Sequence, residues 1–213
     1  MTKKSPNEFA ELKQKINNLE KKVVTLEGKV EELESYKKVS EHVNMVLSQE
    51  LDALNQYSRR SNIVMRNIWL PENETHDQLT EKVSTLIKDE LNLPSAVKDI
   101  DKLHRIGPVK EKNGKKHQNV IIRFRSHKTR YNVFREKKKL KHVKISANLT
   151  KKRGKLLHEA IEFVESINEV DFVFADIHGD LKVKVKKQYK GSNIFKFGSF
   201  ENLKKLLTDM DIQ

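Results

Sequence analysis

Residues 9–33 read FAELKQKINNLEKKVVTLEGKVEEL, and apolar residues recur in them at heptad spacing. With Phe9 at position a, the later a positions are β-branched and every d position is leucine. This pattern predicts a coiled coil, and β-branched a residues with leucine at d favour two strands. The number of heptads is too small to exclude three strands. The residues expected at the oligomer interface are Ile16, Leu19, Val23, Leu26, Val30 and Leu33.

The charges beside this apolar stripe indicate a parallel arrangement. Lysines occupy position g and glutamates position e, so each g residue would face an opposite charge in the next heptad of a parallel partner. An antiparallel partner would bring like charges together. Each exposed pair contributes only about 0–1 kcal/mol, but its sign selects the orientation. The expected pairs are Lys15–Glu20, Lys22–Glu27 and Lys29–Glu34, and the heptad frame shifts near Lys37, Ser40 and Asn44.

Residues 59–148 have the pattern of an α+β domain. Strand-forming runs alternate with two amphipathic helices, whose N-termini Thr75 and Ser126 can cap. The order βαββαβ is the ferredoxin-like arrangement, which RNA-recognition domains use. The strands are expected at residues 61–68, 100–106, 119–125 and 143–146, with a basic loop over residues 107–118.

Residues 149–213 form the third expected domain, a small α/β unit. A long helix with one apolar face is expected first, then strands at residues 172–175 and 181–185, and then a helix capped by Ser199. The chain is therefore expected to be α+β. Its three parts are a parallel coiled coil over residues 1–58, an RNA-recognition-like domain over 59–148 and the α/β domain over 149–213.

The charge of the chain is concentrated in one segment. The 213 residues include 43 Lys and Arg against 30 Asp and Glu, a net charge of +13. Residues 103–156, called the basic segment below, hold 19 Lys and Arg against only Glu111 and Glu136, a net charge of +17. Such a concentration indicates a polyanionic partner, most often a nucleic acid.

Some classes of protein are disfavoured by composition. The chain has no cysteine, which excludes disulfides and cysteine-based zinc sites. No apolar run approaches the 18 residues of a membrane helix, and the first residues lack the apolar core of a signal peptide, so an intracellular protein without a membrane partner is expected. The motifs G-x-S-x-G, G-x-x-x-x-G-K-[ST] and H-E-x-x-H are missing, so neither catalysis nor a metal or other cofactor is expected.

The central strand of the second domain indicates how a nucleic acid would be held. RNA-recognition domains stack bases on aromatic residues of the sheet. Here that strand offers only Phe124, which alternates with Arg123 and Arg125 and is expected to face the core. Contacts to the backbone of a single strand, with low sequence specificity, are therefore expected.

Three short motifs carry a resemblance to a known family. They are residues 54–68 (LNQYSRRSNIVMRNI), residues 120–124 (VIIRF), and residues 145–149 (ISANL) followed by Lys-Lys-Arg at 151–153. Together with the order of the domains, they resemble the first open-reading-frame protein of LINE-type retrotransposons. The resemblance covers nearly the whole chain, although each motif alone is only moderately specific.

The resemblance implies a trimeric coiled coil, cooperative coating of single-stranded RNA and nucleic-acid chaperone activity. It also implies a cytoplasmic ribonucleoprotein, with the nucleus as a second location, in which the reverse transcriptase of the element is a partner. Two features depart from the family: lysines replace arginines over residues 110–118, and the N-terminal part is short. The positions that match the RNA-contacting residues of the family are Arg60, Asn62, Arg123, Arg135 and Arg153.

The sequence thus predicts a homo-oligomeric protein that binds single-stranded RNA, with single-stranded DNA as a second candidate ligand. The alternative is a coiled-coil scaffold whose basic domains bind an acidic protein or a membrane surface. A reader of double-stranded DNA ranks third, through Arg130, Asn132 and Arg135. The candidate nucleic-acid contacts are Arg59, Arg60, Asn62, Arg66, Arg105, Lys115, Lys116, Arg123, Arg125, Arg130, Arg135, Lys138, Lys139, Lys141, Lys152 and Arg153.

Overall fold

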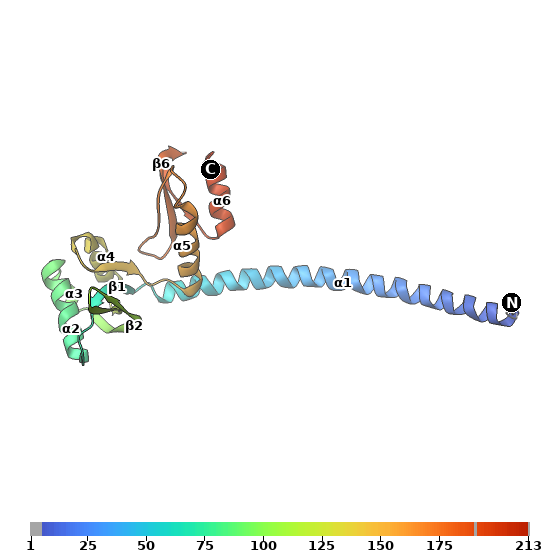
Figure 1. Ribbon diagram of the computed structural model, residues 1–213, viewed down its shortest axis with the longest axis horizontal. Helices are drawn as coiled ribbons and strands as arrows, with labels where there is room; N and C mark the ends of the chain where they lie inside the picture. The colour runs from blue at the N-terminus through green and yellow to red at the C-terminus, as the bar shows by residue number, and fades with distance from the viewer. Residues whose placement is uncertain (1–5, 190, 213) are drawn as a thin grey trace. The chain divides into compact units, whose positions relative to one another are not determined.

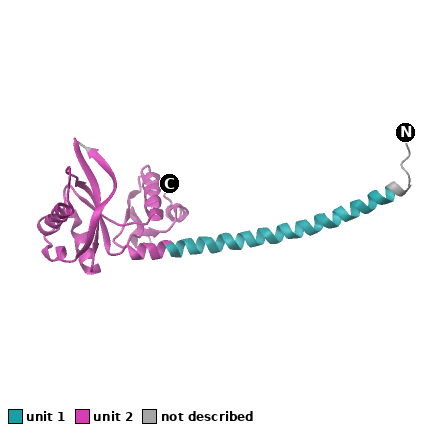
Figure 2. Ribbon diagram, turned by 90° about the horizontal axis from the view of Figure 1, so that it is seen from below, with its two compact units in different colours: residues 1–51 teal, residues 52–213 magenta. Residues whose placement is uncertain are grey.

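The structure is a computed structural model that describes residues 6–189 and 191–212. It is α+β: a long N-terminal helix is followed by two antiparallel sheets with helices (Figure 1). The chain divides into two units, residues 1–51 and 52–213, called unit 1 and unit 2 (Figure 2). Residues 52–58, which the sequence assigns to the coiled coil, therefore belong to unit 2.

Helix α1 runs from Pro6 to Ser58 without a break, including the part near Lys37 and Asn44 where the heptad frame shifts. All six residues expected at the oligomer interface are more than half exposed, Leu33 most of all at 68%. A helix with an uncovered apolar stripe is only marginally stable in water, so this stripe is coiled-coil-like. Among the described residues, no helix combines the length and the apolar character that a membrane span requires.

Unit 2 contains a four-stranded sheet in the order β2-β3-β1-β4, with every neighbouring pair antiparallel. Its elements follow one another in the expected order, with an added π-helical turn (η1), a short helix (α3) and a 3-10 turn (η2). They are β1 (Asn62–Trp69), α2 (His76–Thr85), η1 (Leu86–Glu90), α3 (Pro94–Val97), β2 (Ile100–Lys112), β3 (Lys115–Phe124), α4 (His127–Arg135), η2 (Glu136–Lys139) and β4 (Lys144–Ala147).

Both predicted helix caps in this part of the chain are confirmed. The Thr75 hydroxyl accepts the backbone N–H of Gln78, and the Gln78 side chain accepts the backbone N–H of Thr75. The Ser126 hydroxyl accepts backbone N–H groups at the start of α4. These bonds satisfy donors that would otherwise have no partner at a helix N-terminus.

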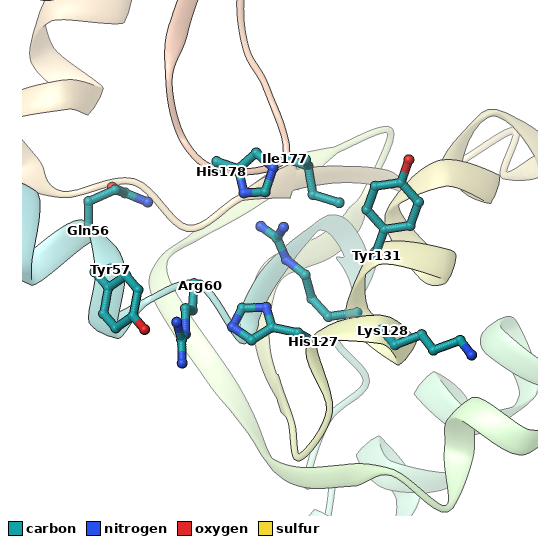
Figure 3. Close-up of a pocket in the computed structure, with 9 residues that line it drawn as sticks. Gln56, Tyr57, Arg60, His127, Lys128, Tyr131, Ile177 and His178 are labelled. Atoms are coloured by element: carbon teal, nitrogen blue, oxygen red, sulfur yellow. The ribbon is translucent and has the colours of Figure 1, made fainter.

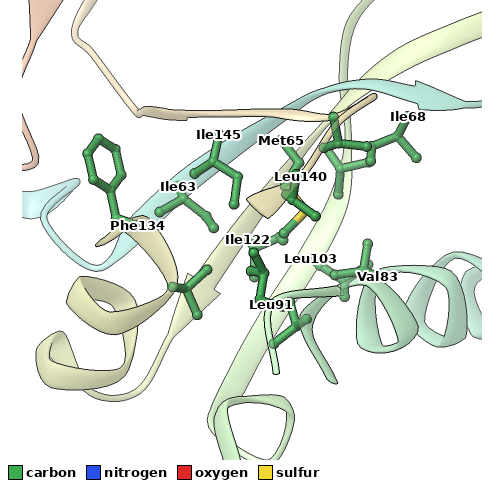
Figure 4. Close-up of a cluster of buried hydrophobic side chains, with 14 of the residues drawn as sticks. Ile63, Met65, Ile68, Val83, Leu91, Leu103, Ile122, Phe134, Leu140 and Ile145 are labelled. Atoms are coloured by element: carbon green, nitrogen blue, oxygen red, sulfur yellow. The ribbon is translucent and has the colours of Figure 1, made fainter. Parts of the chain in front are cut away.

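One face of the four-stranded sheet forms the larger core of unit 2 (Figure 4). Alternate residues of the strands point to this face, and Phe124 is only 1% exposed, so its prediction as a core residue is confirmed. The helices complete the core with Leu79, Val83 and other apolar side chains. The residues of this sheet with the least exposure are Ile63, Met65, Ile68, Val120, Ile122 and Phe124.

The prediction of a basic loop over residues 107–118 is wrong, because β2 and β3 extend through it as a hairpin. The strands meet at Asn113 and Gly114, whose φ angles of 52° and 69° are both left-handed. An Asn-Gly pair is the commonest signal for a tight hairpin turn of this kind. The ladder is irregular between Ile106 and Lys110, beside Gly107, and this irregularity hides the strand pattern in the sequence.

A second, three-stranded sheet in the order β5-β6-β7 lies in residues 149–213. The strand β7 was not predicted, although its burial alternates along the strand, because its apolar residues Ile194 and Phe195 are adjacent and the sequence itself does not alternate strictly. The predicted Ser199 cap is confirmed. The elements are α5 (Lys151–Val164), β5 (Val170–Ala175), β6 (Leu181–Tyr189), β7 (Ser192–Phe197) and α6 (Phe200–Thr208).

The two cores of unit 2 meet near the end of α1. Leu149 packs against both of them. Beside it, the Gln56 amide, 5% exposed, donates to the carbonyl of Asn148 (3.1 Å) and accepts from the backbone N–H of Thr150 (3.0 Å). Asp52 accepts the Thr150 hydroxyl (2.5 Å) and Arg153 Nε (2.8 Å). We call these contacts the junction.

The charges of the junction are matched. Burial alone would raise the pKa of Asp52, but the hydrogen bonds from Thr150 and Arg153 outweigh it and hold the pKa below its usual range. Arg153 also donates to the carbonyl of Gly179 (3.0 Å) in the turn between β5 and β6. The junction therefore joins the end of α1, the segment before α5 and that turn.

The junction predicts a specific cost for a side chain at Gly179. This residue has a φ of +82°, and an added Cβ would collide with the amide of Gln56. Gly179→Ala should therefore lower the free energy of unfolding by about 1–3 kcal/mol more than Gly114→Ala does. Gly114 has a similar φ of +69° but open space around it, so it isolates the backbone penalty. Urea denaturation of both variants tests this, and equal losses would contradict the close approach.

Candidate nucleic-acid interface

The face of the four-stranded sheet opposite the core, called the open face below, is lined with cations. Lys102 and Arg123 are cross-strand partners on β2 and β3, and Arg66 and Lys144 are partners on β1 and β4. All four side chains are exposed. Strand alternation places them there, because their neighbours on each strand include buried core residues.

These cross-strand pairs are unfavourable in the absence of an anion. Like charges directly opposite each other destabilise an antiparallel pair. Arg123 lies 3.3 Å from the Asp101 carboxylate, which offsets part of its charge. Arg66 donates to the hydroxyl of Ser146 (3.1 Å), but within the described chain no carboxylate pairs with Arg66 or Lys144. Phosphate groups would supply the missing negative charge.

The centre of the open face is aliphatic. Val64 and Ile121 lie opposite each other there, at positions between the two pairs of cations. RNA-recognition domains carry aromatic residues on this face of their sheet, on which bases stack. Asn62, opposite Arg123, has a buried Oδ1 atom that lacks a hydrogen-bond partner among the described residues. A ligand hydroxyl or a water molecule could donate to it.

Two further groups of exposed cations extend from the sheet. Lys115 and Lys116 lie at the start of β3 in the hairpin, and Arg125 follows Phe124 at its end. The second group surrounds η2, where Glu136 forms ion pairs with Arg135 (3.2 Å) and Lys139 (3.0 Å). These hydrogen bonds, first from Lys139 and then from Arg135, hold the pKa of Glu136 below its usual range. The exposed candidates there are Arg135, Lys138, Lys139 and Lys141, and Lys152 is exposed on α5.

Three candidate arginines form internal contacts instead. Arg105 binds both carboxylate oxygens of Glu74 and the carbonyls of Ile68, Trp69 and Gln118 at 2.7–3.0 Å. Arg153 belongs to the junction. Arg59 donates to the side chain of Asn148 (3.2 Å) and to the Leu149 carbonyl (3.4 Å). These side chains hold unit 2 together, so contact with RNA would compete with existing bonds.

Arg130 belongs neither to the exposed cations nor to these three arginines. Its side chain is 3% exposed and lines a pocket of about 490 Å³, called the Arg130 pocket below. The end of α1, the start of α4 and the turn between β5 and β6 surround it, with His127 and His178 on opposite sides in Figure 3. The lining residues are Gln56, Tyr57, Arg60, His127, Lys128, Arg130, Tyr131, Ile177 and His178.

The pocket is strongly positive. Burial lowers the pKa of Arg130 to about 10, although Asp176 opposes this shift. Burial, followed by the charges of Arg60 and Arg130 and by His178, lowers the pKa of His127. Arg60 stacks on the Tyr57 ring at 3.8 Å. The pocket is therefore built to disfavour further positive charge and to favour an anion.

Several of these residues were not predicted from the sequence. Lys102 and Lys144 could have been found, because strand alternation places them on the same face as Arg123 and Arg66. His178 and Tyr57 join Arg130 only through the packing of unit 2, and no local pattern in the sequence indicates this.

Two carboxylates near the start of β2 already have partners. Asp99 accepts the backbone N–H of Ser126 (2.9 Å), and Asp101 pairs with Arg123. Over residues 6–189 and 191–212, no three His, Asp or Glu side chains gather as a metal site would require.

Comparison with known proteins adds no relationship. No family model and no curated protein matches the chain. The resemblance to retrotransposon proteins therefore remains a prediction from short motifs.

The lowered pKa of His127 predicts a pH-dependent stability. The unfolded chain, with a histidine pKa near 6.5, takes up the proton more readily than the folded protein. The stabilising contribution is complete above pH 6.5 and is lost as the pH falls from there toward the folded pKa. Melting temperatures between pH 7.5 and 5.5 should therefore fall less in His127→Gln than in the unaltered protein. His142→Gln, outside the pocket, is the control and should not reproduce this difference.

Proposed function

We propose that this chain is a parallel homo-oligomeric protein that binds single-stranded RNA with little sequence preference and acts as a nucleic-acid chaperone. Cations of the open face and of the η2 region would contact phosphates, so the backbone rather than the bases would be held. Single-stranded DNA is a second ligand of the same chemistry.

The observation that carries this proposal is the open face. Arg66 and Lys144 lie opposite each other without a carboxylate partner in the described chain. Lys102 and Arg123 are a second like-charged pair on the neighbouring strands, and Asp101 offsets part of the charge of Arg123. Folding brings these like charges together, although their repulsion lowers stability. A polyanion would reverse that penalty. The element order βαββαβ, which is ferredoxin-like, is compatible with an RNA-recognition domain.

The exposed apolar stripe of α1 supports the oligomer. A second and third copy would cover Leu19, Leu26 and their neighbours, and the Lys–Glu pairs would set a parallel orientation. Linking several basic units would raise the affinity for one long strand through effective concentration. Two strands are favoured by the heptads, and three by the resemblance.

The biological setting of the proposal comes from the resemblance alone. It implies a cytoplasmic ribonucleoprotein of a LINE-type retrotransposon, with the nucleus as a second location and the element's reverse transcriptase as a partner. The sequence motifs at residues 54–68, 120–124 and 145–153 support it.

The first test is binding of a labelled single-stranded RNA of ~30 nucleotides, measured by fluorescence anisotropy across a salt series. We expect log K to fall steeply with log salt, by about 0.7 for each phosphate neutralised. The double variant Arg66→Gln/Lys144→Gln should reduce that slope by about 1.4, the contribution of two phosphates. The double variant should also unfold at higher urea without RNA, because it removes the repulsion.

The control is a double variant that removes two positive charges outside the open face. Lys186 and Lys187 are exposed on β6, outside the open face. Lys186→Gln/Lys187→Gln should leave the slope almost unchanged. Salt-insensitive binding, or equal effects of the two double variants, would refute the interface. Binding to acidic vesicles or to an acidic peptide in place of RNA would favour the scaffold alternative.

The oligomer is tested separately. Leu19→Glu places a charge in the apolar stripe, whereas Asn18→Glu places the same charge at a neighbouring position outside positions a and d. Sedimentation velocity should show dissociation of Leu19→Glu and an intact dimer or trimer for Asn18→Glu. A monomer for the unaltered chain at all concentrations would contradict the coiled coil.

A further inference from the structure

The Arg130 pocket differs from the open face, because it is a hollow between the end of α1, the start of α4 and the turn between β5 and β6, and has the volume of a small-molecule site. We propose that it binds a phosphomonoester, either a free mononucleotide or the terminal phosphate of a nucleic-acid strand. This site goes beyond the coating of a strand, and it uses none of the cations of the open face.

The first argument is the chemistry of the lining. Five of the nine side chains are basic, and none is a carboxylate. Asp176 is the carboxylate that acts on Arg130 from outside the lining. It is already bound to Lys182 (2.8 Å) and to the backbone N–H groups of His178 (2.8 Å) and Asp180 (3.0 Å). The positive charge of the pocket is therefore only partly compensated.

The second argument is that Arg130 is buried and has few hydrogen-bond partners. Arginine is rarely buried to this extent unless it is paired with an acid. Here the guanidinium donates one long hydrogen bond, from Nε to the carbonyl of Asn62 at 3.4 Å, and lies 5.3 Å from the Phe134 ring. Within the described residues no carboxylate lies in ion-pair distance of it. The remaining donors of its planar group suit a phosphate.

The third argument is size and shape. A volume of about 490 Å³ falls within the range of pockets for small ligands. Tyr57 and Tyr131 supply aromatic rings on which a base can stack, and His127 and His178 add two more. A phosphate on Arg130 and a base on a tyrosine ring would use both kinds of side chain.

The burial of Arg130 favours a monoester over a diester. A terminal phosphate can enter a pocket end-on, whereas a phosphodiester within a strand is substituted on both sides. A monoester also carries about 1.5–2 negative charges at pH 7 and three strong acceptor oxygens, against one charge for a diester. The basic side chains Arg60, Lys128 and Arg130, which line the pocket, match the more highly charged group.

The experiment uses the full chain with ¹³C-labelled histidines. AMP, inorganic phosphate and adenosine are titrated while the imidazole NMR signals of His127 and His178 are followed. We expect AMP and phosphate to shift both signals saturably and adenosine not to. The double variant Arg60→Gln/His178→Gln should weaken the affinity for AMP at least tenfold, which is the effect expected from losing hydrogen bonds to a charged group. Both substitutions lie at exposed positions, so the variant should fold, whereas Arg130 is buried.

Lys186→Gln/Lys187→Gln is the matched control, because it replaces two exposed basic side chains outside the pocket, and it should leave AMP binding unchanged. The absence of a saturable shift, equal shifts by AMP and adenosine, or unchanged AMP affinity in the double variant would overturn the proposal. Competition of AMP with a 5′-phosphorylated RNA 12-mer, but not with its 5′-hydroxyl form, would identify a strand end as the source. AMP binding without competition by either would identify a free nucleotide.

The two proposals can fail independently. Steep, salt-dependent RNA binding without any response of the histidines to AMP would leave the coating function and remove this site. If AMP shifts the histidine signals of a chain that does not bind RNA, the pocket site is supported and the coating function is refuted.

Discussion

The pairing of Gln56 with the backbone of residues 148–150 is the constraint on which the arrangement of unit 2 depends. A single buried amide satisfies a carbonyl and an N–H of a segment more than 90 residues away in the chain. Buried polar groups without a partner are costly, so these bonds fix both position and orientation. Asp52 and Arg153 add a matched ion pair beside them. The turn at Gly179 can approach only because that residue lacks a side chain. The last turns of α1 are thereby part of the same compact unit as both sheets.

In the folded chain, the arginines fall into classes by the environment of their side chains, and their positions in the sequence do not indicate these classes. Arg105 and Arg153 are surrounded by acceptors and stabilise the fold, as arginine's planar group with several donors allows. Arg66 and Arg123 lie on strands and are exposed to solvent. Arg130 is buried without an acid and belongs to neither class. The high positive charge of the basic segment therefore overstates how many of its cations are free to meet a polyanion, because several of them are structural.

The sequence predicts the local features of this fold well, because their causes are local. Capping by Thr75, Ser126 and Ser199 depends on residues within one helical turn, and the burial of Phe124 follows from strand alternation. The hairpin at Asn113 was missed although its turn signal is local, because the irregularity near Gly107 interrupts the pattern. The burial of Arg130 and its meeting with His178 could not be predicted, since they arise from packing between segments far apart in the chain. The same is true of Arg105, whose acceptors are mostly backbone carbonyls.

The two proposed sites also differ in how solvent acts on them. Cations on the open face are exposed, so dissolved salt screens their attraction over about 8 Å at physiological ionic strength. The guanidinium of Arg130 is almost fully removed from water, where electrostatic interactions are stronger and less screened. Exposed cations suit rapid, reversible contact with many phosphates, and a buried one suits a single well-fitted group. Because Gln56 belongs to the junction while Tyr57 and Arg60 follow it directly, the pocket can form only when the end of α1 is held in place. The contact that organises the fold therefore also builds the pocket.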